Sequence, residues 1–264
     1  MTRGRATLGL AMRRVPISAL ACGLALVLAG SAAAATPPAR AKGSLLEAWN
    51  NITTFNEDLA RIDRARDALE REVAQAPSLD ALLLLSWAHL AWGDYRAPSL
   101  DARIASYEGG RDVARRAIAM APRSPEAHFW YAANLGRWAV AKGRLQAVFV
   151  LATLKQEIQT VLELDPDFVP GLAVAGSFYL ETPALLGGDV ARAEGYLRRA
   201  LSLDPHFTRA RLELARCLIA RRRYDEARRE LKTVIEERRP SYVADWVMRH
   251  RPTAERLMVE IGAR

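Results

Sequence analysis

Prolines recur along this chain at the ends of apolar-periodic segments, and this recurrence constrains the fold more than any other feature. Successive prolines of this kind stand 45, 44, 39 and 35 residues apart. Proline cannot continue a helix, and it disfavours helical geometry in the residue before it. Each one therefore marks the end of a helix and the entry into a new unit. The five residues are Pro77, Pro122, Pro166, Pro205 and Pro240.

Between the prolines, apolar residues recur with the period of a helix, which predicts an all-α chain of antiparallel hairpins. We expect an N-terminal helix pair over 44–75 and a closing helix or two over 241–262. The four hairpins between them are expected at 79–92 with 104–120, 125–141 with 145–163, 168–181 with 190–203, and 207–221 with 224–237. One hairpin cannot bury its apolar face alone, so at least three must stack to share a core.

The last proline spacing is close to the 34 residues of a tetratricopeptide repeat, and the third hairpin resembles that family most. Gly176 stands where the two helices of the family approach closely, and Tyr179 stands at its aromatic position. In the second helix of this hairpin, Ala193 and Leu197 fit the small and large buried positions. The resemblance implies that residues 44–264 form stacked hairpins in a right-handed superhelix.

The first residues have the three parts of a secretory signal peptide. Arg13 and Arg14 precede an apolar run over 15–29, and small residues follow it. The apolar run is shorter than the ~20 residues that a helix needs to cross a bilayer. We therefore expect a signal peptide at 1–35, a flexible linker at 36–43, and a periplasmic or secreted protein. A lipid anchor on Cys22 is the alternative, and we favour it less because the longest apolar stretch continues beyond Cys22.

The net charge of +8 suggests nucleic acid at first, but part of it belongs to the signal peptide. Residues 1–35 hold four arginines and no acid, so the remaining chain carries +4. The basic tract Arg221-Arg222-Arg223 is followed by a helix in which acids alternate with arginines, as a solvated helix face requires. We therefore expect no nucleic-acid partner.

No motif for catalysis or cofactor binding is present. The four histidines fit no metal-ligand spacing, and the chain has no nucleophile elbow, Walker loop or dinucleotide fingerprint. Cys217 is the single cysteine after signal cleavage, and it lies in a helical apolar pattern where a free cysteine packs as a small core residue. We predict a protein that is not an enzyme and that needs no cofactor or metal.

Two segments set this chain apart from general tetratricopeptide arrays. One is the aromatic segment over 127–138, and the other is a loop between the helices of the third hairpin. Together with the long helix that ends near Asp167, they resemble the T-component proteins of TRAP-type (tripartite ATP-independent periplasmic) transporters, over about residues 60–240. The loop is the most specific part of this resemblance. Its motif residues are Pro183, Leu185, Leu186, Gly187, Gly188 and Asp189.

This resemblance implies a periplasmic accessory protein that binds the transporter's substrate-binding protein and can form a homo-oligomer. It also implies a cavity for an apolar or amphipathic small ligand. In tetratricopeptide geometry, the concave face of the first helices carries the binding residues. These residues are Leu83, Trp87, Phe129, Ala133, Arg137, Ser177, Leu180 and Arg216. A general envelope scaffold for protein assembly is the alternative function.

The insertions should distinguish the two functions. If the segments 94–104, 142–147 and 181–188 surround one apolar channel, the transporter hypothesis gains. If they point into solvent, a scaffold is favoured.

Each site residue also has a purely structural interpretation. The aromatic residues Trp87 and Phe129 have the spacing of core residues between hairpins, and the arginines can be solvated or paired with nearby acids. Gly187 and Gly188 can serve a sharp turn before a helix capped by Asp189. For this loop we favour the structural interpretation, with both leucines packed back on the hairpin.

Overall fold

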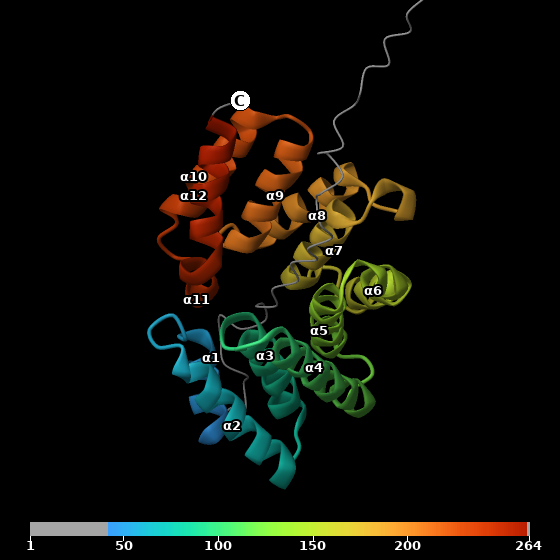
Figure 1. Ribbon diagram of the computed structural model, residues 1–264, viewed down its shortest axis with the longest axis vertical. Helices are drawn as coiled ribbons and strands as arrows, with labels where there is room; N and C mark the ends of the chain where they lie inside the picture. The colour runs from blue at the N-terminus through green and yellow to red at the C-terminus, as the bar shows by residue number, and fades with distance from the viewer. Residues whose placement is uncertain (1–41, 263–264) are drawn as a thin grey trace, which may run out of the picture.

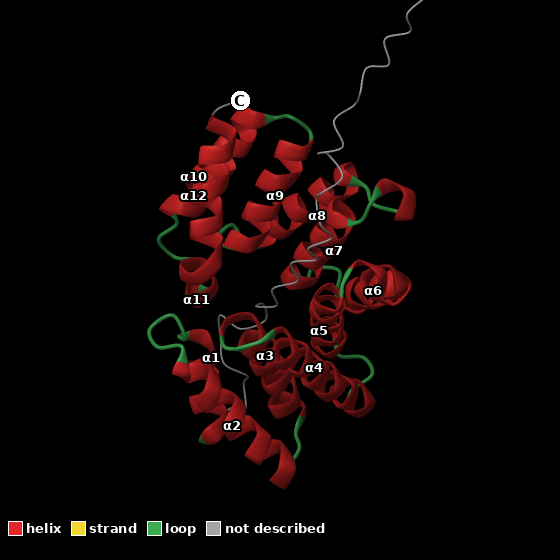
Figure 2. Ribbon diagram, in the orientation of Figure 1, coloured by secondary structure: helices red, strands yellow, loops and turns green. Residues whose placement is uncertain are grey.

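The computed structural model describes residues 42–262, and these residues form helices and turns without any strand (Figure 2). The predicted signal peptide, Cys22 and most of the predicted linker lie outside the described residues. The longer helices are α1 (Ser44–Thr53), α2 (Ala60–Gln75), α3 (Leu79–Tyr95), α4 (Leu100–Met120), α5 (Pro125–Lys142), α6 (Arg144–Leu164), α7 (Val169–Glu181), α8 (Val190–Leu203), α9 (Thr208–Ala220), α10 (Tyr224–Glu236) and α12 (Arg251–Gly262). Three short elements complete the chain: the 3₁₀ turn η2 (Ala184–Leu186), α11 (Val243–Asp245) and the π-helical turn η3 (Trp246–His250). The predicted all-α hairpin architecture is confirmed.

Local signals explain where the helices begin and end. Each of the five punctuating prolines lies between two helices, as predicted. Three serines cap α3, α4 and α5, because each side chain accepts a hydrogen bond from an N–H group of the first turn. Ser78, Ser99 and Ser124 accept from the third residue beyond them at 3.1–3.2 Å. These caps satisfy donors that have no partner inside the helix.

The extra residues of the first two hairpins lengthen their helices instead of forming loops. The α4 and α6 helices each have 21 residues, and α3 continues to Tyr95. Between α5 and α6 a single residue remains, Gly143, whose positive φ of 112° suits glycine. The expected insertions at 94–104 and 142–147 are therefore mostly helical.

Helices that are adjacent in the chain pack side by side, and glycines allow the closest approaches. A Cβ atom placed on Gly176 would lie 2.5 Å from Cγ of Leu197, which confirms the predicted close contact between α7 and α8. In the first hairpin, a Cβ atom on Gly93 would collide with the ring of Tyr107. The buried aliphatic and aromatic side chains of successive hairpins form one continuous core.

The array curves until its two ends meet (Figure 1). The segment around α11 lies beside α1 and α3, far from it in sequence but close in space. Arg249 of η3 donates to Asp94 of α3 at 2.8 Å, and Tyr95 donates to Asp245 of α11 at 3.2 Å. The predicted closing helices therefore do more than cap the fourth hairpin, because they also tie the C-terminal end to the first hairpin.

None of the helices between residues 42 and 262 combines the length and the apolar character needed to cross a bilayer.

Replacing Gly176 by Leu should separate α7 from α8, because the new side chain would overlap Leu197. We expect a loss on the order of 2 kcal/mol or more in the free energy of unfolding, measured by urea denaturation. Gly195→Ala is the matched control, since a Cβ atom added to this exposed glycine of α8 would meet nothing within 4 Å. The control should gain about 0.5–1 kcal/mol from helix propensity. If Gly176→Leu were as stable as the natural protein, Gly176 would not lie at the close contact between α7 and α8 that is described above.

Candidate functional site

The predicted concave residues lie on the first helices of the four hairpins, α3, α5, α7 and α9, as expected. Four of the eight are buried, and the other four are half-buried. Phe129 is 2% exposed, and Ala133 and Ser177 are fully buried, so in this conformation they offer a ligand almost no surface. Leu83 and Leu180 are half-buried. The role of these residues in binding stays a prediction.

Aromatic side chains connect the first two hairpins. The rings of Trp87 and Trp130 stack with their centroids 5.6 Å apart, and Phe129 meets Trp130 edge-on at 4.9 Å. Phe129 also contacts Phe168, which begins the third hairpin. Aromatic pairs of this geometry stabilise an interior beyond their buried area. These contacts agree with the interpretation of Trp87 and Phe129 as core residues.

Arg137 takes part in a buried ionic cluster centred on Asp94. Asp94 accepts from Arg137 of α5 and Arg249 of η3, both at 2.8 Å, and from the Tyr107 hydroxyl of α4 at 2.7 Å. Burial alone would raise the pKa of Asp94, but the two guanidinium groups hold it below its usual value. One carboxylate thus joins three helices of the first hairpins to the C-terminal segment.

A second group of charges lies on α7 and α9. Arg216 donates to Glu181 at 2.9 Å and to Glu213 at 3.0 Å. In the same groove, Arg209 donates to the hydroxyl of Ser177 at 3.3 Å. Burial lowers the pKa of Arg209 to about 10; Glu213 opposes the shift, whereas Arg137 and Arg249 add to it. The predicted residues Arg137, Ser177 and Arg216 therefore belong to one charged concave interior.

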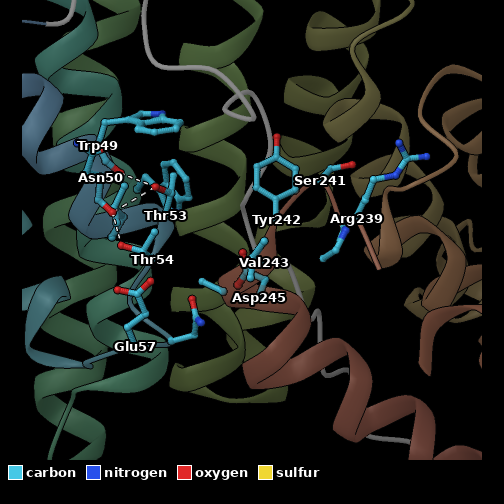
Figure 3. Close-up of a pocket in the computed structure, with 15 residues that line it drawn as sticks. Trp49, Asn50, Thr53, Thr54, Glu57, Arg239, Ser241, Tyr242, Val243 and Asp245 are labelled. Carbon is cyan, nitrogen blue, oxygen red and sulfur yellow. Dashed lines mark hydrogen bonds between the residues drawn. The ribbon is translucent and has the colours of Figure 1, made fainter. Parts of the chain in front are cut away.

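A cleft of about 600 Å³ opens where the two ends of the array meet (Figure 3). One wall is α1, with Trp49, Asn50 and Thr53, and the other is the segment 239–245, which includes Tyr242. Trp87 is the one predicted site residue that lines it. The indole N–H of Trp49 is buried and has no hydrogen-bond partner among the residues that the structure describes. This cleft mixes polar and aromatic groups, as binding clefts do.

A smaller cleft of about 290 Å³ lies between α9 and the C-terminal elements. Its basic and apolar lining includes Arg209, Leu212, Arg216, Arg249, Arg256 and Leu257. Three of these residues come from η3 and α12, a part of the chain where sequence reasoning found no site.

Sequence reasoning missed the residues that close the array: Asp94, Tyr95, Asp245 and Arg249. The sequence held two signals: an acid, Asp94, near the apolar end of α3, and a base, Arg249, in the segment before α12. Neither signal names a partner, because Asp94 and Arg249 are separated by 155 residues.

The motif loop over 183–189 has the backbone conformation that we predicted, but its leucine side chains do not pack as we predicted. Gly187 has a φ of 95°, and a Cβ atom on Gly188 would collide with the carbonyl oxygen of Thr182, so both glycines are required by conformation. Asp189 caps α8 as predicted, accepting from the N–H groups of two residues in its first turn. The expectation that both leucines pack back on the hairpin is wrong, since Leu185 is 99% exposed and Leu186 46%. Backbone hydrogen bonds from Leu186 and Gly188 to Pro183 hold the loop in a conformation in which both side chains face solvent.

Further apolar side chains are exposed at the start of α6. Leu145 is 72% exposed and Phe149 70%, and Val148 lies between them on the same helix face. The opposite face of α6 supplies Val150 and Leu154 to the core. This helix is therefore apolar on two sides, and only one of them is covered within the described chain.

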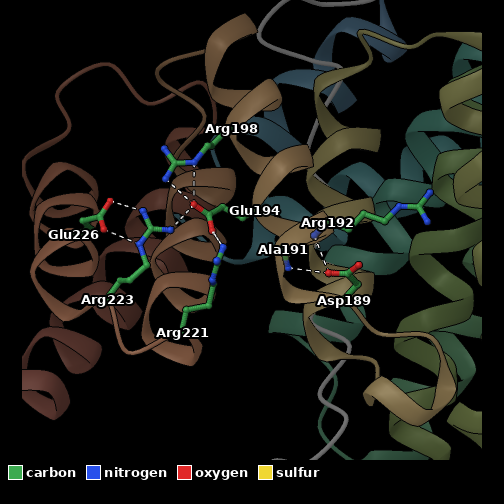
Figure 4. Close-up of polar contacts among 8 residues, drawn as sticks. All are labelled: Asp189, Ala191, Arg192, Glu194, Arg198, Arg221, Arg223 and Glu226. Atoms are coloured by element: carbon green, nitrogen blue, oxygen red, sulfur yellow. Dashed lines mark hydrogen bonds and ion pairs between the residues drawn. The ribbon is translucent and has the colours of Figure 1, made fainter.

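The basic tract is paired with acids on two helices (Figure 4). Glu194 of α8 accepts from Arg198, Arg221 and Arg223, and Arg223 also pairs with Glu226 at 2.6 Å. Although burial opposes it, these hydrogen bonds lower the pKa of Glu194 to about 2. Arg221 and Arg223 of the tract therefore connect the fourth hairpin to α8 of the third, and they are also partly exposed to solvent.

The remaining candidate groups have structural surroundings. Cys217 is buried, as predicted, and burial raises the pKa of its thiol to about 12. His128 lies 2.7 Å from Glu157, and His206 lies 3.1 Å from Glu237. Over residues 42–262 there is no group of three or more metal-ligating side chains placed to hold an ion.

Comparison with known proteins agrees with this geometry. The tetratricopeptide repeat family matches residues 184–245, which cover most of the motif loop, α8 and the fourth hairpin. A thermophilic tetratricopeptide protein of Thermus thermophilus superimposes with a TM-score of 0.56 at 21% identity, over 78% of this chain and 98% of that one. The fold is a tetratricopeptide-like superhelix. A mutant of the protein MamA is also similar, at 19% identity over 72% of this chain and 94% of that one, with a TM-score of 0.38. A search of curated proteins finds no significant match.

Asp245 should make the stability of this superhelix depend on pH. Burial raises the pKa of its carboxyl to about 6, although Arg249 and the Tyr95 hydroxyl oppose the shift. A group whose pKa is higher in the folded state stabilises the fold below its unfolded pKa, and this contribution is lost as the pH rises through 6. Asp245→Asn should therefore be more stable than the natural protein at pH 7.5, on the order of 2–3 kcal/mol, with the difference vanishing near pH 4.

Denaturant titrations at several pH values would measure this difference. Asp225→Asn is the control, because that side chain is 87% exposed. If Asp245→Asn is instead less stable at pH 7.5, the attraction between Asp245 and Arg249 outweighs the cost of burial.

Proposed function

We propose that this protein is a non-enzymatic accessory protein of the cell envelope, which binds the substrate-binding protein of a TRAP-type transporter. The tetratricopeptide-like fold supports a role in binding proteins in general. The finer assignment rests on the resemblance of the motif loop and of the aromatic segment to the T-component proteins. Export by the predicted signal peptide would place the protein beside such a partner.

The observation that carries this proposal is the state of the motif loop, which is exposed and rigid at once. Leu185 projects fully into solvent. The backbone beneath it is held by hydrogen bonds from Leu186 to Pro183 at 2.8 Å and from Gly188 to Pro183 at 3.1 Å. The N–H of Asp189 also donates to Tyr179 at 2.9 Å, which ties the loop to α7. Because the backbone of the loop is already held, little backbone entropy is lost when a partner covers Leu185, so the loop suits a binding contact.

The exposed face of α6 would extend this contact. In Figure 1 the connection between α7 and α8 projects from the same side of the molecule as α6. Leu145, Val148 and Phe149 of α6 are apolar residues without cover in the described chain. We call these three residues and Leu185 the docking face. Exposed apolar groups gathered on one side commonly mark a protein interface.

A general envelope scaffold remains the second candidate, and one observation favours it. The insertion at 181–188 points into solvent, and those at 94–104 and 142–147 are mostly helical, so no apolar channel is formed by all three. By the criterion stated above, this geometry favours protein assembly over a ligand channel. We therefore propose that this protein binds the protein partner of the transporter, and we do not propose a ligand channel.

Leu185→Ser and Phe149→Ser should each weaken binding to the substrate-binding protein encoded beside the transporter's membrane subunits. We expect at least a tenfold increase in Kd, about 1.4 kcal/mol, by isothermal titration calorimetry. Val259→Ser is the matched control, since this residue of α12 is 77% exposed and lies outside the docking face. If Leu185→Ser and Phe149→Ser bind as tightly as the natural protein and the control, the partner does not bind at the docking face. If the natural protein does not bind that partner at all, the transporter proposal fails and the scaffold alternative stands.

A further inference from the structure

The cleft between α1 and the segment 239–245 is separate from the docking face, whose residues are not part of its lining. The lining comes mainly from α1, from the turn after α1 and from the segment 239–245, which all lie outside the four hairpins (Figure 3). Trp87 of α3 also lines the cleft, but it is 3% exposed and adds almost no surface. A volume of about 600 Å³ is typical of small-molecule sites.

Each wall of this cleft carries a partly exposed aromatic residue. Trp49 belongs to α1 and Tyr242 to the segment 239–245, and both side chains are half-buried. The ring of Tyr242 packs edge-on against Phe207, with the centroids 5.6 Å apart, and this contact restricts its motion. The face of an aromatic ring carries partial negative charge, so it attracts C–H groups that bear partial positive charge. Both walls therefore offer aromatic surface to a ligand with exposed C–H groups.

Two uncharged carboxamides line the same cleft. The side chains of Asn50 in α1 and Asn56 in the following turn make no hydrogen bond to the part of the chain that the structure describes. Asn50 is exposed and Asn56 is half-buried, so a ligand can reach both side chains. A carboxamide both donates and accepts hydrogen bonds, and so does a hydroxyl group. The two asparagines therefore match a ligand that carries several hydroxyls.

The charged residues of the lining do not favour an ionic ligand. Glu57 is paired with Arg61 at 2.6 Å, and Asp245 accepts from the Tyr95 hydroxyl at 3.2 Å. Arg239 is the third charged residue of the lining, and it is exposed. Two acids and one base give no excess of positive charge that would compensate an anion for its lost hydration. The lining therefore suits a neutral ligand.

We propose that this cleft binds a neutral saccharide. Trp49 and Tyr242 contact the C–H groups of its sugar ring, and Asn50 and Asn56 form hydrogen bonds with its hydroxyls. A sugar ring combines these two kinds of group in one uncharged molecule. Because the saccharide contacts both α1 and the segment 239–245, its binding stabilises the closed arrangement of the two ends. This inference does not rest on the transporter partner, since the docking face lies elsewhere.

Maltose, cellobiose and N,N′-diacetylchitobiose are suitable probes, each added to the purified protein and followed by calorimetry and tryptophan fluorescence. We expect saturable binding of at least one disaccharide, with a changed fluorescence and a raised Tm. Glucuronate, a sugar that carries a negative charge, should bind at least about fivefold more weakly. The neutral peptide N-acetyl-tetra-alanine amide tests the other class of ligand with C–H and hydrogen-bonding groups.

Three results would overturn the proposal. They are the absence of saturable binding for all three disaccharides, tighter binding of glucuronate than of any of them, and tighter binding of the peptide than of any of them.

Two variants locate the saccharide in the cleft. Asn50→Ala removes an exposed carboxamide, and Trp49→Leu removes the indole ring while it keeps an apolar side chain. Each should raise the Kd of the disaccharide at least about fivefold. Asn51→Ala is the matched control, because it removes the same group from the same helix at a position that does not line the cleft. Natural affinity in Asn50→Ala, or an equal loss of affinity in Asn51→Ala, would refute the site.

Discussion

A buried carboxylate is the most connected contact between the two ends of this protein. Asp94 accepts from Tyr107, Arg137 and Arg249, and so joins α3, α4, α5 and the C-terminal segment. A buried ion pair adds little net stability, because desolvation offsets most of the attraction, but removing one partner leaves an uncompensated charge. The cluster therefore acts mainly by specifying one arrangement of the two ends. The cleft between α1 and the segment 239–245 has one wall from each end.

The closure also changes what the concave face of a tetratricopeptide-like array offers. In an open array this face is a groove for a peptide or a helix. Here the C-terminal segment occupies part of it, and charged groups such as Arg216 and Glu181 are paired with one another. Two clefts remain, one between α1 and the segment 239–245 and one between α9 and the C-terminal elements, together with the docking face of exposed apolar residues.

Much of the fold could be predicted from the sequence, but less of the site could. The hairpin boundaries agree to within a few residues, because prolines and serine caps act locally. The contact of Gly176 with Leu197 follows from the same repeat pattern. The sequence places Leu185 and Leu186 wrongly, since the hydrogen bonds that pin their loop depend on the distance to Tyr179 in the folded hairpin. For Trp87 and Phe129, helical periodicity places the residues on an apolar face, but it does not show whether that face packs in the core or lines a binding groove.

By itself the sequence determined the all-α class, the number and limits of the hairpins, and their close packing, because helix period, proline and capping all act within a few residues. Only the tertiary structure decided that the ends meet, that Arg249 and His250 face the same cleft as Arg209, and that Asp245 is buried beside Tyr95. The physical reason is distance along the chain. A pair such as Asp94 and Arg249, 155 residues apart, forms only after the curvature of every intervening hairpin has accumulated, and no local pattern records that sum.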